Sequence, residues 1–196
     1  MDLKISDSIL PNLALSREEA QLVDRCIPIK SFKAGEVLLR EGQIARNCYF
    51  VIQGCVRSYH IVNGEERTTG FYLEEDSIAP LASYLSQTPA HHFLTCVEDS
   101  VLAVLHFDRE RELYQKLPKM EALCRTSMEE EYAKQQDLLQ NYLTKTPEER
   151  YLLLQKNRPE LLQRIPQYHL ATYLGVKPES LSRIRKRIAQ KGHKSD

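Results

Sequence analysis

The sequence predicts an α+β chain with an N-terminal β jelly-roll barrel, a long helix and a C-terminal helix-turn-helix domain. Three observations predict it. Short β-rich runs separated by turns occupy residues 27–107, and apolar residues recur at spacings of three and four over residues 109–144. Residues 165–188 have the pattern of two short helices joined by a glycine turn. We therefore expect domains at 1–117, 118–144 and 145–196.

The N-terminal segment, up to about Cys26, is expected to be helical. Ser16 is followed three residues later by Glu19, which is the capping-box pattern at the start of a helix. Leu22 and Val23 would then face inward.

The next segment is expected to form the barrel. Seven or eight short strands at this spacing are typical of a closed sandwich or jelly roll, which encloses either a small ligand or a filled core. Asn63-Gly64 is the preferred dipeptide of a type I′ hairpin turn. The candidate strands are residues 27–32, 37–40, 48–52, 56–62, 67–73, 93–97 and 101–107.

Residues 109–144 read as helical with one break, at Pro118. A helix of about 25 residues spans nearly 40 Å, which is longer than one small domain needs. Such helices between domains often pair with a second copy, so we expect a homodimer. The alternative is a single helix packed along its own barrel.

The C-terminal domain is expected to begin at Thr146-Pro147-Glu148-Glu149, which supplies an N-cap, a first-turn proline and an N3 glutamate. Within the later helix-turn-helix, Gly175 would end the first helix and Pro178 would open the second. The residues expected to be buried are Leu170, Ala171 and Leu174 on the first helix, and Leu181, Ile184 and Ile188 on the second.

The second helix of this motif leaves a polar, cationic face exposed. Such a face suits the major groove of DNA, where arginine can bond a guanine edge bidentately and glutamate can accept from cytosine. Arg185 would add sequence-independent attraction to phosphates. The alternative is a basic surface helix that caps a small helical domain. The candidate DNA-binding residues are Lys177, Glu179, Ser180, Arg183, Lys186 and Arg187.

Charge is unevenly distributed along the chain of 196 residues, although the formal net charge is zero. From Lys145 onward there are 12 lysines and arginines against five acidic residues, whereas the remainder has 15 against 22. A basic C-terminal domain on an acidic body indicates one nucleic-acid surface, although uneven decoration of helices would give the same count.

Five cysteines without a C-x-x-C pair favour reduced thiols in a cytoplasmic protein. Their spacing does not predict a metal site, and no cofactor is expected. No apolar run approaches the roughly 18 residues of a membrane span, and the N-terminus lacks the apolar core of a signal peptide.

Four stretches of the chain have distinctive sequences: Lys33-Ala34-Gly35-Glu36, Arg40-Glu41-Gly42, Tyr49-Phe50-Val51-Ile52-Gln53-Gly54, and Gly175 with Glu179-Ser180 and Ser182-Arg183-Ile184. With these stretches, a barrel, a long helix and a helix-turn-helix in this order resemble the Crp/Fnr family of bacterial transcription regulators, over roughly residues 27–189. That resemblance implies a cyclic-nucleotide-binding type of barrel, a homodimer and double-stranded DNA as partner, with RNA polymerase as a further candidate partner. It also matches Glu179, Ser180 and Arg183 to base- and phosphate-contacting positions.

The barrel departs from the cyclic-nucleotide-binding members of that family. Pro80 stands where they carry a glutamate for the ribose, and no arginine for the phosphate occurs between Arg67 and Arg109. We therefore expect that cyclic AMP does not bind in the usual way, because a buried phosphate without a cation loses a charge-assisted bond worth about 1.5–3 kcal/mol. His91 and His92 could form an anion or pH-sensitive contact, or be plain surface histidines. The candidate effector-pocket residues are Ala79, Pro80, Leu81, Ala90, His91 and His92.

The sequence thus favours a homodimeric, sequence-specific DNA-binding regulator whose effector is not indicated. The alternative is a ligand-binding module whose C-terminal helical domain contacts a protein partner. An enzyme is not indicated, because the chain has no G-x-S-x-G, P-loop or H-E-x-x-H motif and no plausible catalytic carboxylate pair.

Overall fold

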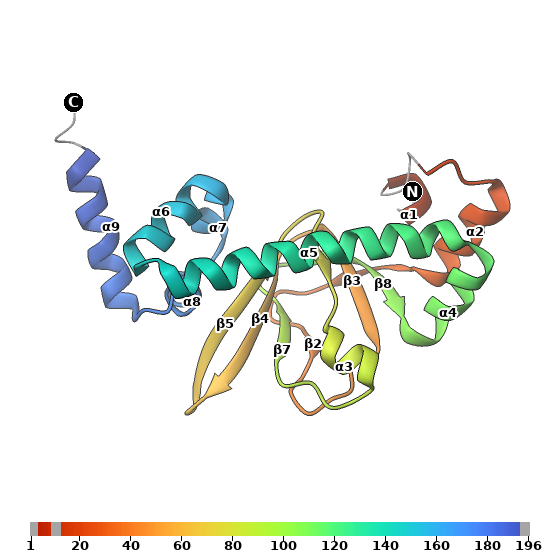
Figure 1. Cartoon of the computed structure of the whole chain (residues 1–196), viewed down its shortest axis with the longest axis horizontal. Coiled ribbons are helices and arrows are strands. Elements are labelled where there is room, and N and C mark those ends of the chain that lie inside the picture. The colour runs from red at the N-terminus through yellow and green to blue at the C-terminus, as the bar shows by residue number, and fades with distance from the viewer. Residues whose placement is uncertain (1–3, 9–12, 193–196) are drawn as a thin grey trace. The chain divides into compact units, whose positions relative to one another are not determined.

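The computed structural model of the chain describes residues 4–8 and 13–192 (Figure 1). Contacts divide the chain into two compact units. The first unit contains Met1–Ser58 and Phe71–Ala133, and the second contains Tyr59–Gly70 and Lys134–Asp196. This division cuts the long helix, so the boundaries at 117 and 144 that the sequence predicts stay a prediction.

The β-rich part consists of two four-stranded sheets, and the pairs that β3 and β8 make with their neighbours are antiparallel. This arrangement confirms the predicted jelly-roll barrel. One sheet has the order β1 (Ile29–Phe32), β8 (Ser100–His106), β3 (Asn47–Gln53) and β6 (Ser77–Ile78). The other has the order β2 (Val37–Leu39), β7 (Phe93–Cys96), β4 (Val56–Val62) and β5 (Glu65–Tyr72).

All seven predicted strand regions contain strands, but two short elements between these strands were not predicted. Strand β6 has only two residues, too few to show an alternating pattern. Helix α3 (Leu81–Ser86) follows Pro80 and has no side-chain cap, so it lacks the usual signal of a helix start. The turn between β4 and β5 is as expected, since Asn63 and Gly64 both have positive φ angles, of 54° and 79°.

A side-chain cap begins the helix that follows Ser16. The hydroxyl of Ser16 and the carboxylate of Glu19 form the predicted capping box, but residues 13–16 are not helical. Residues 1–3 and 9–12, also expected in a helix, lie outside the described residues. The N-terminal helices are α1 (Ile5–Ser8) and α2 (Arg17–Cys26); α4 (Phe107–Lys116) and α5 (Pro118–Thr144) follow the barrel, with the predicted break before Pro118.

The first unit contains two hydrophobic clusters on opposite faces of the sheet that includes β3 and β8. Side chains alternate along a strand. Accordingly, Tyr49 and Val51 belong to the cluster inside the barrel, and Phe50 and Ile52 pack on the outer cluster with α4 and α5. The interior of the barrel is filled in part by Tyr84 of α3, which is 1% exposed and packs edge-on against Phe107.

The second unit is helical apart from the ends of β4 and β5. Its helices are α6 (Pro147–Asn157), α7 (Pro159–Arg164), α8 (Gln167–Tyr173) and α9 (Pro178–Gly192). Thr146 and Glu149 form the predicted capping box at the start of α6. The buried side chains of these helices are Tyr151, Leu154, Leu161, Leu170, Ala171, Leu181 and Ile184.

Candidate nucleic-acid interface

Helices α8 and α9 form the helix-turn-helix that the sequence predicts. Gly175 ends α8 with a φ of +69°. Its N–H donates to the Thr172 carbonyl, and the Val176 N–H donates to the Ala171 carbonyl. This pair of bonds is the Schellman arrangement, which a glycine in the left-handed region permits. The turn therefore satisfies the last carbonyls of α8 and redirects the chain into α9.

The apolar stripe of α9 packs inward as predicted. Leu181 is 1% exposed and Ile184 is 6% exposed, while Ile188 is half-buried one turn later. With 3.6 residues per turn, this stripe leaves Glu179, Arg183 and Lys186 on the opposite side of the helix. All three of these side chains are exposed.

Arg183 lies along its own helix on that exposed side. Its guanidinium donates to the Glu179 carbonyl at 3.4 Å and to the Ser180 hydroxyl at 3.2 Å. Since arginine has five N–H donors, these two bonds leave donors for a further partner. The hydroxyl of half-buried Ser180 thus positions Arg183, a relationship that the sequence did not reveal.

Arg187 differs from the other candidates because it makes an ion pair within the unit. Its guanidinium lies 2.7 Å from a carboxylate oxygen of Glu148 in the first turn of α6. The structure thus groups Glu179, Arg183 and Lys186 on one outward face and places Arg187 at the flank of that face. Lys177, in the turn before α9, is exposed.

Arg150 connects the elements around the turn, a role that no sequence pattern indicated. Its guanidinium donates to the carbonyls of Tyr142, Lys145 and Leu174 at 3.0, 2.7 and 2.8 Å. It also lies over the Tyr142 ring, 4.6 Å from the centroid. One side chain therefore connects the end of α5 to the C-terminus of α8.

The β4–β5 hairpin belongs to the same unit, and Thr68 connects it to α8 through its backbone N–H, which donates to the Thr172 hydroxyl at 3.4 Å, and through its hydroxyl. The hydroxyls of Thr68 on β5 and Thr172 on α8 lie 2.8 Å apart. Thr68 is 6% exposed, so this contact is shielded from water. Sequence reasoning assigned both residues only to their own elements, because the contact spans 104 positions.

The structure does not bring the candidate effector-pocket residues into one site. Ala79 lines a cavity of about 590 Å³ in the first unit, and Pro80 lines a separate cavity of about 420 Å³. Neither lining includes Leu81, Ala90 or the two histidines. Ala90 is 3% exposed in the barrel core, His91 is exposed and His92 is half-buried.

All five cysteines have free thiols. Within residues 4–8 and 13–192 we find no group of three or more histidine, cysteine or acidic side chains arranged to hold a metal ion. No helix in the described part of the chain is both long and apolar enough to cross a membrane.

The fold and the exposed helix define a class of protein, in which a β-barrel domain of the cyclic nucleotide-binding type is joined by a long helix to a helix-turn-helix. Comparison with known proteins agrees. Residues 29–116 match the family described as "Cyclic nucleotide-binding domain". The chain is 25% identical to the fumarate and nitrate reduction regulatory proteins of Escherichia coli and Klebsiella oxytoca, over 97% of this chain and 80% of each relative.

Solved structures share the architecture. The c-di-GMP responsive regulator CLP of Xanthomonas campestris is 16% identical, with a TM-score of 0.71 over 90% of this chain and 93% of that one. FixK2 of Bradyrhizobium japonicum is 19% identical, with a TM-score of 0.68 over 85% of this chain and 86% of that one. The chain is thus similar in sequence to transcriptional regulators of the Crp/Fnr type over nearly its whole length, and it shares the fold of the CLP and FixK2 structures.

Proposed function

We propose that the protein is a sequence-specific DNA-binding transcriptional regulator that acts as a homodimer. The observation that carries this proposal is the outward face of α9, where Glu179, Arg183 and Lys186 lie opposite the buried Leu181 and Ile184. A short helix that buries one stripe and exposes cations can enter the major groove with its N-terminal residues at the base edges.

The exposed residues divide into two roles in this proposal. Arg183 and Glu179 are the base-reading candidates, because a guanidinium matches a guanine edge and a carboxylate accepts from cytosine. Ser180 positions Arg183 through the bond described above. Lys177, Lys186 and Arg187 attract phosphates, which gives affinity that depends strongly on salt.

Replacement of Arg183 by alanine tests whether this residue recognises a DNA base, and Arg185→Ala is its matched control. Arg185 is an exposed arginine on the same helix, off the face that carries Arg183. In binding-site selection, Arg183→Ala should relax the preferred base at one position and weaken binding by about 1–3 kcal/mol. Arg185→Ala should weaken binding to all sequences alike. Equal base preference in the wild type and Arg183→Ala would contradict the assigned role, and an absence of salt-sensitive binding to random DNA would favour a protein partner.

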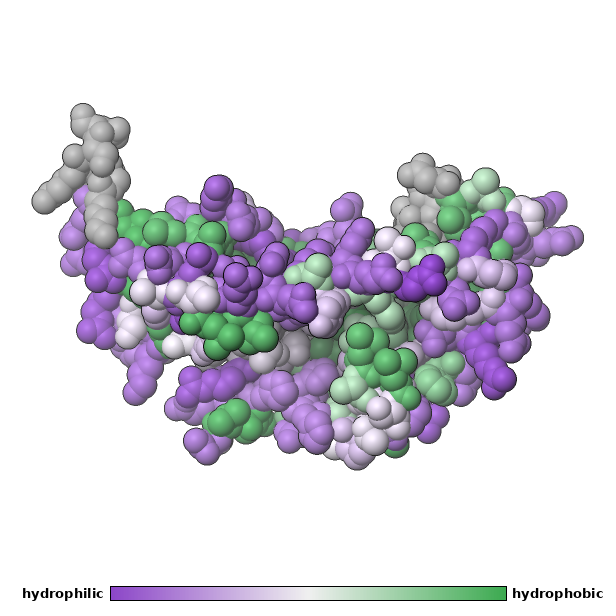
Figure 2. All heavy atoms as spheres, in the orientation of Figure 1, coloured by the Kyte–Doolittle hydropathy of each residue, from purple (hydrophilic) through white to green (hydrophobic). Residues whose placement is uncertain are grey.

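The dimer is inferred from α5. Among the described residues of this 27-residue helix only Met120 is buried. Large apolar side chains lie exposed on its second half, and the surface along which α5 runs shows hydrophobic patches among the charged groups (Figure 2). A partner helix that covers these apolar side chains would stabilise α5. The exposed side chains are Tyr132, Leu139, Tyr142 and Leu143, of which Leu139 is 59% and Leu143 is 74% exposed.

Leu139→Asp should convert the dimer to a monomer in sedimentation measurements, and it should weaken binding to a palindromic site. Asn141→Asp is the control, because it adds the same charge on the other side of α5. A dimer that survives Leu139→Asp would place the interface elsewhere.

We also propose that the barrel does not bind cyclic AMP in the usual way. Pro80 and the lack of an arginine between Arg67 and Arg109 support this, as does Tyr84, whose ring occupies the barrel core. Calorimetric titration should show no binding of cyclic AMP with micromolar affinity.

We further propose that a regulator of this kind acts in the cytoplasm, with DNA and RNA polymerase as its partners.

A further inference from the structure

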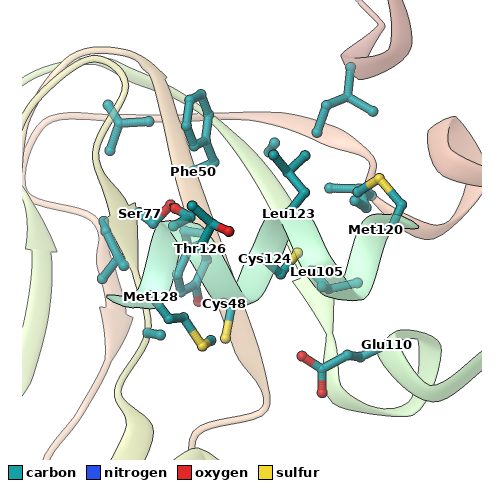
Figure 3. A pocket seen from close by; sticks show the side chains of 18 of the residues that line it. Cys48, Phe50, Ser77, Leu105, Glu110, Met120, Leu123, Cys124, Thr126 and Met128 are labelled. Atoms are coloured by element: carbon teal, nitrogen blue, oxygen red, sulfur yellow. The ribbon is translucent and has the colours of Figure 1, made fainter. Parts of the chain in front are cut away.

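The first unit contains a cavity of about 590 Å³ between the first half of α5 and the outer face of the sheet that contains β3 and β8 (Figure 3). Phe50 and Leu105 line it from the sheet, and Met120, Leu123 and Cys124 line it from α5. Cavities of about 300–1,000 Å³ are the usual size of small-molecule sites.

This cavity lies mainly against the outer face of the sheet, although Tyr49, Val51 and Ile78 of the interior cluster also belong to its lining. Phe50 and Ile52, which line it, belong to the outer hydrophobic cluster together with Leu105 and Met120. The interior cluster is built from the alternate residues of β3 and from Tyr84. A ligand in this cavity would therefore contact α5 and the outside of the sheet.

The charge of the lining restricts what can bind. Three glutamates, at positions 75, 110 and 130, line the cavity, and no lysine, arginine or histidine occurs among the described residues around it. An anion brought near carboxylates in a partly desolvated site is repelled, and no cation offsets the cost of its desolvation. Phosphates and carboxylates are therefore poor ligands for this site.

The thiols of the lining remain neutral and add to its apolar character. Burial raises the pKa of Cys48 to about 12, and burial also raises the pKa of Cys124. Neither is a thiolate near neutral pH, so both behave as small, polarizable apolar groups. The sulfur atoms of these cysteines and of Met120 and Met128 are visible around the cavity (Figure 3).

The polar groups of the lining make hydrogen bonds among themselves. The hydroxyls of Ser77 and Ser127 lie 2.8 Å apart, and the Tyr114 hydroxyl donates to Glu110 at 3.2 Å. A carboxylate can accept several hydrogen bonds, so Glu110 can accept one more from a ligand. The lining thus offers an acceptor at one edge of an otherwise largely apolar space.

We propose that this cavity binds a neutral, largely apolar small molecule that carries one hydrogen-bond donor, which meets the carboxylate of Glu110. The proposal goes beyond DNA binding and does not rest on it, because its test measures only the occupancy of the first unit.

Two fluorescent probes that differ by one charged group test the proposal on the full chain. N-phenylnaphthylamine is neutral, apolar and carries one N–H donor, whereas anilinonaphthalene sulfonate adds an anionic sulfonate to the same skeleton. We expect saturable binding of the neutral probe and at least about tenfold weaker binding of the sulfonate. Glu110→Gln should reduce the ratio of the affinity for the neutral probe to the affinity for the sulfonate probe. Equal binding of both probes to the wild type would overturn the proposal.

Substitutions on α5 locate the bound probe. Leu123 lines the cavity and is 38% exposed, so an indole ring at this position can lie at the rim of the cavity without displacing core side chains. Leu123→Trp should weaken binding of the neutral probe at least about tenfold. Ala122→Trp is the control, because Ala122 is exposed and does not line the cavity.

Three outcomes would overturn the proposal. The first is an equal effect of the two tryptophans, with circular dichroism showing that both variants fold, since the probe would then lie on exposed apolar surface. The second is an unchanged probe ratio in Glu110→Gln. The third is fluorescence of the neutral probe that falls as the protein concentration is raised at a constant molar ratio of probe to protein, which would show that a second copy covers the cavity.

Discussion

Arg187 of α9 and Glu148 of α6 form an ion pair of 2.7 Å, in which the arginine side chain is 55% exposed and the glutamate side chain 23% exposed. An exposed pair of this kind contributes only about 0.2–1 kcal/mol to stability. Its larger effect is on orientation, because it holds a guanidinium of the proposed DNA-binding helix against α6.

Removal of this pair should change DNA binding more than folding. Glu148→Gln frees Arg187 for a phosphate, so the slope of log affinity against log salt should steepen by about 0.9. Glu160→Gln is the control, since it removes the same charge from an ion pair with Arg158. Fluorescence anisotropy over a salt series measures both slopes. Equal slopes in the two variants would mean that the ion pair with Glu148 does not keep Arg187 from a phosphate.

Gly175→Ala should destabilise the second unit by about 1–2 kcal/mol from the left-handed backbone alone. A Cβ at this position would also lie 2.8 Å from the Tyr142 hydroxyl, so that side chain must move. Gly64→Ala is the comparison, because it has a φ of +79° and nothing within 4 Å of its Cβ. Urea unfolding should show the larger loss for Gly175→Ala, and restoring space with Tyr142→Ala should reduce the difference. Equal losses at the two glycines would show that the Tyr142 contact costs nothing.

Thr68→Val should cost about 1 kcal/mol, because it removes a hydroxyl whose partner, Thr172, is partly buried. The cost should stay small because the Thr172 hydroxyl still donates to the His169 carbonyl. A double-mutant cycle with Thr172→Val, measured by thermal or urea unfolding, should show non-additivity of at least about 0.5 kcal/mol. Strict additivity would indicate that the hairpin and α8 do not share this bond in solution.

Thr146→Ala should lower stability by about 0.5–2 kcal/mol, because it removes the N-cap of α6. Glu149 supplies the pH dependence, since hydrogen bonds from Thr146 lower the pKa of its carboxyl group below the ordinary value. A lowered folded-state pKa means that the contribution is present above the unfolded pKa and is lost as the pH falls through the folded pKa. The difference between the wild type and Glu149→Gln in urea unfolding should therefore shrink on acidification. A difference that grows in acid would contradict this assignment.

Local sequence patterns were sufficient to predict the structure wherever the interacting residues lie within one short segment. The hydroxyls of Ser16 and Thr146 cap the helices that follow them, and Gly175 adopts the positive φ that a helix end requires. These features were predictable because the interacting groups lie within a few residues of one another. The short strand β6 and the uncapped helix α3 were missed because they carry no such local signal.

The sequence by itself therefore determined the order of the elements, the barrel, the helix-turn-helix and the cationic character of α9. Only the tertiary structure decided which cations bond to other parts of the unit, as Arg150 and Arg187 do. It alone joined Thr68 to Thr172 and placed Glu110 and Cys124 around one cavity. The physical reason is that periodicity and capping act over one or two turns of chain, whereas ion pairs and cavities depend on which distant segments pack together.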